Sequence, residues 1–201
     1  QYLVLWDMLT KHLGKDAAKH VIATTDKEKG NLIKLADREG FKKYVIPDSV
    51  GGRFSEMCPV GLVAAAVCGI DIKVMLKGAA YADELASSPD LYKNAPLMAA
   101  AMQYIAMQKG MNISVMMPYA DSLKYMSDWY CQLWGESLGK KHDLDGNIVN
   151  VGQTPVKALG VTDQHSQVQL YTEGPFDKVI TILGVDSYRK EVTIPEGCED
   201  I

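Results

Sequence analysis

Apolar side chains recur every three to four positions over residues 1–13, which predicts an amphipathic helix that ends at Gly14. Residues 20–24 and 43–47 are short apolar runs rich in β-branched residues, and each predicts a buried parallel strand. Between them, residues 28–39 return to helical spacing. A strand, a helix and a strand in this order predict part of a doubly wound α/β fold. Two strands alone make an incomplete sheet.

The middle of the chain is rich in predicted helix. Helical spacing covers residues 59–69, 72–85 and 95–109. Residues 112–118 predict a strand, and Asp121 is the predicted cap of a helix that runs to residue 138.

The last third of the chain is predicted to be less regular. Residues 140–157 are predicted to be mostly loop, and Thr162 is the predicted cap of a helix that ends near residue 172. Residues 178–184 predict a buried strand and residues 191–194 a shorter one. The α/β pattern of the first fifty residues breaks near residues 48–53, where two glycines interrupt it.

Composition restricts the class of protein. With 201 residues, 47% of them hydrophobic and 23% charged, the chain is large enough to bury a substantial core. The net charge is -4, and there is no long basic run, so nothing in the electrostatics favours nucleic acid. A small anionic substrate would need a local positive site.

The four cysteines are Cys58, Cys68, Cys131 and Cys198, and no two of them form a CxxC pair. They are predicted to be buried free thiols in a reducing compartment. The longest apolar run, residues 60–70, is too short to span a bilayer, and no signal peptide is visible. A cytoplasmic location and no membrane partner are therefore expected. Because the chain opens inside a predicted helix, we also expect that an upstream segment has been removed.

The first candidate site is Gly51-Gly52-Arg53, directly after a predicted strand. Paired glycines let the backbone approach a ligand closely, and an Arg after them can present several donors to an oxyanion. A Gly-Gly turn with a solvated Arg is the alternative that the residues alone leave open.

The second candidate site is the pair Gln132 and Glu136, which share one face of a predicted helix. Glu136 falls in the last helical turn, where the negative end of the helix dipole disfavours a carboxylate. Such a group suits a general base that accepts a proton near neutral pH. A surface ion pair between Glu136 and Lys140 is the alternative.

The third candidate is His165, in the first turn of the helix predicted to start at Thr162. The positive end of the dipole disfavours imidazolium there, which favours a neutral His that can exchange protons. A structural or merely exposed His is the alternative. No set of residues in the sequence resembles a metal cluster.

Three segments, in this order, resemble glucose-6-phosphate isomerases. D-S-V-G-G-R-F-S-E-M-C-P-V-G (Asp48–Gly61) resembles the first signature of that family. Q-L-W-G-E-S-L-G-K (Gln132–Lys140) resembles the segment that carries its catalytic glutamate. The stretch from Asn150 to Pro175 resembles the segment that carries its catalytic histidine, in the form of the shorter bacterial branch. Leu133-Trp134-Gly135 stands where many members have Gly-x-Asp-Met.

The resemblance implies a role for each candidate residue. Glu136 matches the base that moves a proton between C2 and C1 through a cis-enediol, and Arg53 matches the residue that stabilises the enediolate. The backbone at Gly52 would line the same pocket, and Gln132 would lie near the substrate phosphate. His165 would assist opening of the sugar ring in the active site of a neighbouring subunit, which implies a homodimer. Neither a metal nor an organic cofactor is implied.

The resemblance also implies a partial sugar-isomerase (SIS-like) fold, a doubly wound parallel sheet with a helix-rich middle. Residues 1–52 would be the later half of the first sugar-isomerase domain, and residues 53–201 the first part of the second. The family's Ser/Thr-rich phosphate loop and its C-terminal lysine are not present in this sequence. The isolated chain is therefore expected to be inactive and to associate through exposed apolar edges.

Two other functions are weighed beside the isomerase. The first is a non-catalytic regulator that binds a sugar phosphate on the same fold. The joint presence of Arg53, Glu136 and His165 argues against it, because a sensor needs no proton-shuttling base. The second is an inert fragment made by design or cleavage, which is compatible with an active parent.

Overall fold

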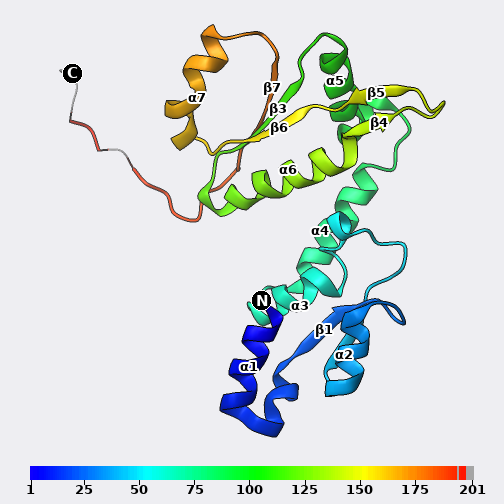
Figure 1. Cartoon of the computed structure of the whole chain (residues 1–201). Coiled ribbons are helices and arrows are strands. Elements are labelled where there is room, and N and C mark those ends of the chain that lie inside the picture. Colours follow the sequence, from blue (N-terminus) through cyan, green and yellow to red (C-terminus); the bar gives the residue numbers. More distant parts are fainter. Residues whose placement is uncertain (194, 198–201) are drawn as a thin grey trace. The chain divides into compact units, whose positions relative to one another are not determined.

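The computed structural model describes residues 1–193 and 195–197, so Cys198 and the end of the strand predicted at 191–194 lie outside the described residues. The chain forms two compact units, Gln1–Ser88 and Pro89–Ile201 (Figure 1), and each is taken by itself below. The boundary expected between residues 52 and 53 concerns domains of the resembled family and stays a prediction.

The first unit begins with a β-α-β arrangement, as the apolar pattern predicts. In the described part of the chain its two strands pair in parallel, with Ile22 beside Lys42 and Thr25 beside Val45. Gly40 adopts a left-handed φ of 74° and ends the connecting helix. The elements are α1 (Tyr2–Leu13), η1 (Gly14–His20), β1 (Ile22–Thr25), α2 (Asn31–Glu39) and β2 (Lys42–Val45).

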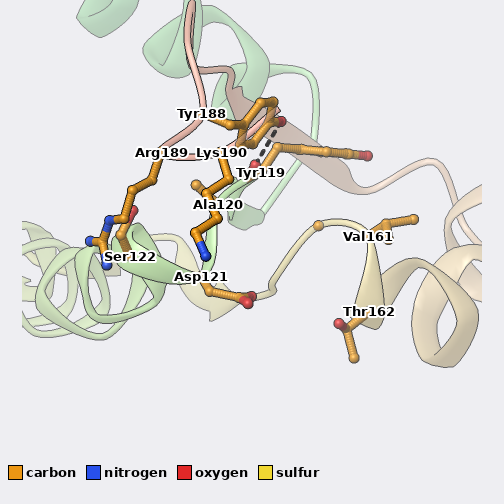
Figure 2. Close-up of a pocket in the computed structure, with 10 residues that line it drawn as sticks. Tyr119, Ala120, Asp121, Ser122, Val161, Thr162, Tyr188, Arg189 and Lys190 are labelled. Atoms are coloured by element: carbon orange, nitrogen blue, oxygen red, sulfur yellow. Dashed lines mark hydrogen bonds between the residues drawn. The ribbon is translucent and has the colours of Figure 1, made fainter. Parts of the chain in front are cut away.

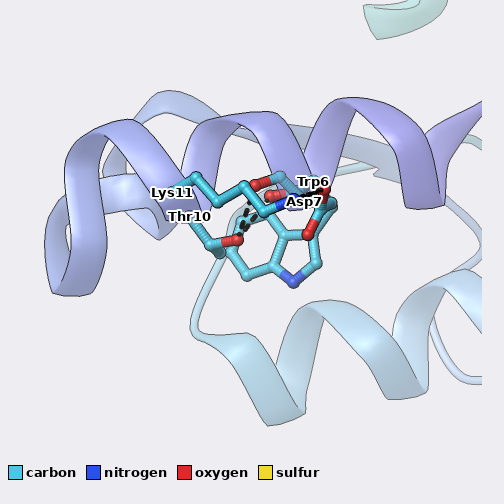
Figure 3. A network of polar contacts seen from close by, with 4 residues as sticks. All are labelled: Trp6, Asp7, Thr10 and Lys11. Carbon is cyan, nitrogen blue, oxygen red and sulfur yellow. Dashed lines mark hydrogen bonds and ion pairs between the residues drawn. The ribbon is translucent and has the colours of Figure 1, made fainter.

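Aromatic packing holds α1 against this unit. Trp6 lies with its ring centroid 5.0 Å from that of Phe41, which is buried in a cluster with Ala23 and Ala36. The same helix carries local polar contacts (Figure 3), in which the half-buried Thr10 donates to the carbonyl oxygen of Trp6. Lys11 and Asp7 form an exposed ion pair there, which adds at most about 1 kcal/mol. The Trp6 contacts, rather than the ion pair, therefore fix α1.

The rest of the first unit is a turn followed by two helices. The elements are η2 (Gly52–Phe54), α3 (Pro59–Val67) and α4 (Ile72–Leu85). Asp71 caps α4, since its carboxylate accepts from the backbone N–H groups of Lys73 and Val74.

In the second unit, the described strands include a three-stranded parallel sheet in the order β6-β3-β7. Val115 and Met117 of the central strand are buried with Ala158. The elements are η3 (Leu91–Lys93), α5 (Ala95–Gln108), β3 (Ile113–Pro118), η4 (Asp121–Leu123), α6 (Lys124–Leu138), β4 (Lys140–His142), β5 (Ile148–Val151), β6 (Thr154–Lys157), α7 (Thr162–Glu173) and β7 (Lys178–Leu183). The predicted fold class, α/β with parallel sheets, is confirmed.

The sheet order places α6 and α7 on opposite faces. The chain steps from β3 to β6 through α6, and then returns past β3 to β7 through α7. Right-handed crossovers in opposite directions put their helices on opposite sides of the sheet, as Figure 1 shows. Both helices run antiparallel to the strands, so α6 ends at the amino edge of the sheet and α7 begins at its carboxyl edge.

Two predictions about secondary structure are wrong. Residues 140–157 contain β4, β5 and β6, although the sequence predicted mostly loop. All the residues of β4 and β5 are exposed, so no apolar alternation marks them, and Pro155 is tolerated in β6 because that strand is an edge strand. Conversely, residues 191–193 form no strand.

The predicted helix caps and buried thiols also need correction. Leu123 precedes α6 and Val161 precedes α7, and in the described part of the chain neither helix has a side-chain cap from Asp121 or Thr162. The described cysteines are free, but only Cys58 among them is buried, whereas Cys68 is exposed at the end of α3 and Cys131 is partly buried. Among the described residues, no helix is long and apolar enough to cross a membrane.

Candidate active site

Arg53 lies in the tight turn η2 of the first unit. Phe54 donates its backbone N–H to Gly51 and Ser55 donates its own to Gly52, so the turn closes on the two glycines. The Arg53 side chain is half-buried, and its guanidinium carbon lies 5.6 Å from the centroid of the Phe54 ring. The structure confirms a turn at the two glycines, and the role of Arg53 stays a prediction.

The end of the same segment is shaped by a close backbone approach. A Cβ atom added at Gly61 would lie 2.3 Å from the carbonyl oxygen of Glu56, which no real side chain could occupy. Cys58 precedes α3 and Pro59 is its first residue, a position that suits proline. The turn that carries Arg53 is thus followed by a tightly packed segment that leads directly into α3.

Gln132 and Glu136 lie side by side on the exposed face of α6 in the second unit. The Gln132 side-chain amide donates to Glu136 Oε1 at 3.2 Å. Lys140, the alternative partner that spacing suggested for Glu136, donates to the carbonyl oxygen of Ser137 at 2.8 Å. The shared helix face predicted for Gln132 and Glu136 is confirmed.

The opposite face of α6 is anchored in the core of the second unit. Tyr130 is buried, and its hydroxyl lies 2.6 Å from Ser114 Oγ on the central strand β3. Trp134 stacks on Tyr130 with ring centroids 5.0 Å apart. Burial raises the pKa of the Tyr130 hydroxyl. No motif in the sequence pointed to this contact, because its partners are sixteen residues apart on a helix and a strand.

A second contact ties the start of α6 to the sheet. Lys157 at the end of β6 pairs with Asp128, and this hydrogen bond raises the pKa of Lys157. Both side chains are partly exposed, so solvent screens this ion pair and the buried contact of Tyr130 is the main anchor of α6.

His165 is exposed in the first turn of α7, far from Glu136 within the same unit. Glu136 lies in the last turn of α6 at the amino edge of the sheet, whereas His165 lies at the carboxyl edge on the other face. Strands of four to six residues separate these edges by roughly 13–20 Å. The structure therefore brings Gln132 and Glu136 together but holds His165 apart from them. Gly52 and Arg53 belong to the first unit, whose placement relative to the second is not determined.

A cavity of about 840 Å³ lies at the carboxyl edge of the three-stranded sheet (Figure 2). Three segments that follow β3, β6 and β7 line it, and the Tyr188 hydroxyl donates to the carbonyl oxygen of Tyr119 at 3.0 Å across its wall. Sequence reasoning missed these residues because they form no motif. The rule that parallel sheets bind ligands beyond the carboxyl ends of their strands is the signal that could have found them. The lining residues include none of the candidate catalytic residues.

No group of three or more His, Cys, Asp or Glu side chains that could hold a metal ion is found among the described residues.

Comparison with known proteins identifies the family. The family model described as phosphoglucose isomerase matches residues 4–188. A glucose-6-phosphate isomerase from Carboxydothermus hydrogenoformans is 55% identical over 195 residues, which make up 97% of this chain and 42% of the relative. One from Rubrobacter xylanophilus is 44% identical over 201 residues, which cover all of this chain and 45% of the relative.

Two solved structures are similar to this chain in fold. A hypothetical protein from Thermus thermophilus superposes with a TM-score of 0.89 at 40% identity, over 98% of this chain and 46% of that one. A glucose-6-phosphate isomerase from Chlamydia trachomatis superposes with a TM-score of 0.76 at 26% identity, over 90% of this chain and 35% of that one. The predicted partial sugar-isomerase fold is confirmed, and the chain spans less than half the length of these relatives. With a family model matched over most of its residues, the chain belongs to the phosphoglucose isomerase family.

Proposed function

We propose that this chain supplies the base and the oxyanion-binding residue of a glucose-6-phosphate isomerase. The side-by-side placement of Gln132 and Glu136 on an anchored helix, within a segment that matches the family, is the observation that supports it most. Glu136 lies on the exposed face of α6, and the contact between Tyr130 and Ser114 holds this helix to the sheet.

In this mechanism Glu136 removes the proton from C2 of the open-chain aldose. The electron pair of that C–H bond forms the C1–C2 double bond, and the carbonyl oxygen at C1 gains the charge of an enediolate. The Arg53 guanidinium stabilises this charge, and the charge-assisted interaction strengthens as the charge develops. The proton of the C2 hydroxyl passes to the oxygen at C1, which moves the charge of the enediolate to the oxygen at C2. Glu136 then returns its proton to C1, and the oxygen at C2 becomes the ketone.

The remaining roles follow from the same homology. Gln132 binds near the substrate phosphate and the Gly52 backbone lines the pocket. His165 assists ring opening in the active site of a second subunit, because within one chain it lies at the other edge of the sheet from Glu136. A site that uses both residues therefore requires a homodimer. The enzyme acts in the cytoplasm, in glycolysis and gluconeogenesis.

We expect the 201-residue chain to be inactive by itself. Its sequence contains neither the Ser/Thr-rich phosphate loop nor the C-terminal lysine that the family resemblance implies. Turnover and ligand binding are therefore measured on the longest form of this protein that its gene encodes.

The test is the substitution Glu136→Gln, which keeps the size of the side chain and its hydrogen bond to Gln132 but removes the base. Turnover should fall by a factor on the order of 10²–10⁴, while the affinity for a sugar phosphate changes little. Glu173→Gln is the matched control, since Glu173 is also exposed in the last turn of a helix of the second unit. Undiminished turnover in Glu136→Gln would exclude Glu136 as the base, and binding without turnover in the unmodified protein would favour the regulator.

A further inference from the structure

Ser55 is a buried polar residue directly after the turn that carries Arg53. Only 7% of its surface is exposed. Its hydroxyl donates to the carbonyl oxygen of Gly52 at 2.7 Å, and its backbone N–H points to the same oxygen at 3.4 Å. The Gly52 carbonyl is therefore fixed by two donors. Because a peptide unit is planar, a fixed Gly52 carbonyl also fixes the orientation of the Arg53 N–H and of the bond that leads to Arg53 Cα.

Cys58 fixes the backbone of Ser55 through two hydrogen bonds. The thiol of Cys58 donates to the carbonyl oxygen of Ser55 at 2.9 Å, and the backbone N–H of Cys58 donates to it at 3.1 Å. Cys58 is itself buried and immediately precedes α3. A chain of hydrogen bonds thus runs from the start of this helix, through Ser55, to the peptide unit in front of Arg53.

We propose that Ser55 is a positioning residue for Arg53. Its hydroxyl sets the direction from which the guanidinium meets the oxyanion of the enediolate, so Ser55 acts through Arg53 and not on the substrate. This role rests on the proposed function of Arg53. It matters because a catalytic group misplaced by about 1 Å can lose roughly 10²-fold in rate.

A purely structural role for Ser55 predicts something different. If the hydroxyl only helps the turn to fold, its removal lowers stability and affects every ligand alike. If it positions Arg53, its removal selectively weakens ligands that carry the oxyanion. Two probes separate these cases. One is a hydroxamate of a five-carbon sugar phosphate, which mimics the enediolate. The other is glucitol 6-phosphate, which has the phosphate but no group that mimics the enediolate.

The measurement is the dissociation constant of each probe for the unmodified protein, Ser55→Ala and Arg53→Ala. Ser55→Ala should weaken hydroxamate binding by roughly 10- to 100-fold and change glucitol 6-phosphate binding less than about twofold. In the Arg53→Ala background, adding Ser55→Ala should have no further effect on the hydroxamate, since the two residues act as a unit. In turnover, Ser55→Ala should lower kcat and leave KM nearly unchanged.

Ser127→Ala is the matched control. Its hydroxyl makes the same bond to the carbonyl oxygen three residues earlier, at 2.6 Å, and the residue is 3% exposed. This variant should lose thermal stability as Ser55→Ala does and keep the ratio of the two dissociation constants. An unchanged ratio in a folded Ser55→Ala protein would overturn the role of Ser55 while leaving that of Arg53 intact. An unchanged ratio in Arg53→Ala would remove the proposed role of Arg53, and that of Ser55 with it.

Discussion

The substitution Tyr130→Phe removes one buried hydroxyl from the anchor of α6 and leaves the ring in place. Ser114 is fully buried, with 0% of its surface exposed, and its hydroxyl lies 2.6 Å from that of Tyr130. Its other contact, to Gln103 Oε1, is long at 3.4 Å. The change therefore leaves a buried hydroxyl with one weak partner.

The magnitude follows from two contributions. A hydrogen bond between neutral groups contributes about 1 kcal/mol net, and a buried polar group left poorly satisfied costs about 1–3 kcal/mol. We expect Tyr130→Phe to lower the free energy of unfolding by about 1–3 kcal/mol. For a chain of this size, each kcal/mol corresponds to a fall in Tm of roughly 2–4 °C.

The assay is urea unfolding followed by the fluorescence of tryptophan, to which Trp134 contributes through its stacking on Tyr130. Ser114→Ala should cost a similar amount. The double variant should be little worse than either single one, because both partners of the bond are then removed. A loss below about 0.3 kcal/mol in Tyr130→Phe, or strict additivity in the double variant, would refute this reasoning.

Three further predictions concern pH, packing and association. Burial raises the pKa of Tyr130 above its ordinary value of 10.0, so the folded state holds this proton more tightly than the unfolded state. The stability that it contributes is present below about pH 10 and is lost as pH rises through the folded-state pKa, so Tyr130→Phe should flatten the alkaline limb of the stability curve. Gly61→Ala should destabilise the chain by about 1–3 kcal/mol in thermal unfolding, because its Cβ would meet the Glu56 carbonyl oxygen at 2.3 Å; an unchanged Tm would contradict the close approach. Leu3 and Leu5 are 76% and 59% exposed, so the 201-residue chain should dimerise or aggregate in light scattering, whereas a monodisperse monomer would count against this expectation.

Much of the fold could be predicted because apolar spacing marks elements that pack on a core. The helix Ile72–Leu85 was predicted to the residue, and the strand Ile113–Pro118 to within one residue. The hairpin of β4 and β5 could not be predicted, because both strands are exposed and carry no alternation. Asp163 shows why a cap predicted from residue type failed. The carboxylate of Asp163 accepts from the backbone N–H of Leu159 at 2.7 Å. The side chain that bonds the backbone at the start of α7 is therefore that of Asp163, one residue after the predicted cap Thr162.

The candidate site could be predicted where its residues are close in sequence. The pairing of Gln132 with Glu136 follows from helix geometry alone, and the turn at Arg53 follows from its glycines. The residues that hold this turn and this helix in place were missed. Ser55 bonds the carbonyl oxygen of Gly52, and Tyr130 bonds Ser114 on a neighbouring strand, and neither contact leaves a pattern in the sequence. Helical spacing also could not show that His165 lies at the other edge of the sheet, since that depends on the order of the strands.

The most direct test of the role of Glu136 is solvent deuterium incorporation, followed by NMR. Fructose 6-phosphate is incubated in D₂O with the longest form of this protein that its gene encodes, either unmodified or as Glu136→Gln. The account predicts that the unmodified protein incorporates deuterium at C1 of fructose 6-phosphate and at C2 of glucose 6-phosphate, between which the proton moves. Glu136→Gln should incorporate none above background. Exchange at an unchanged rate in Glu136→Gln would contradict the account, because another group would then be moving the proton.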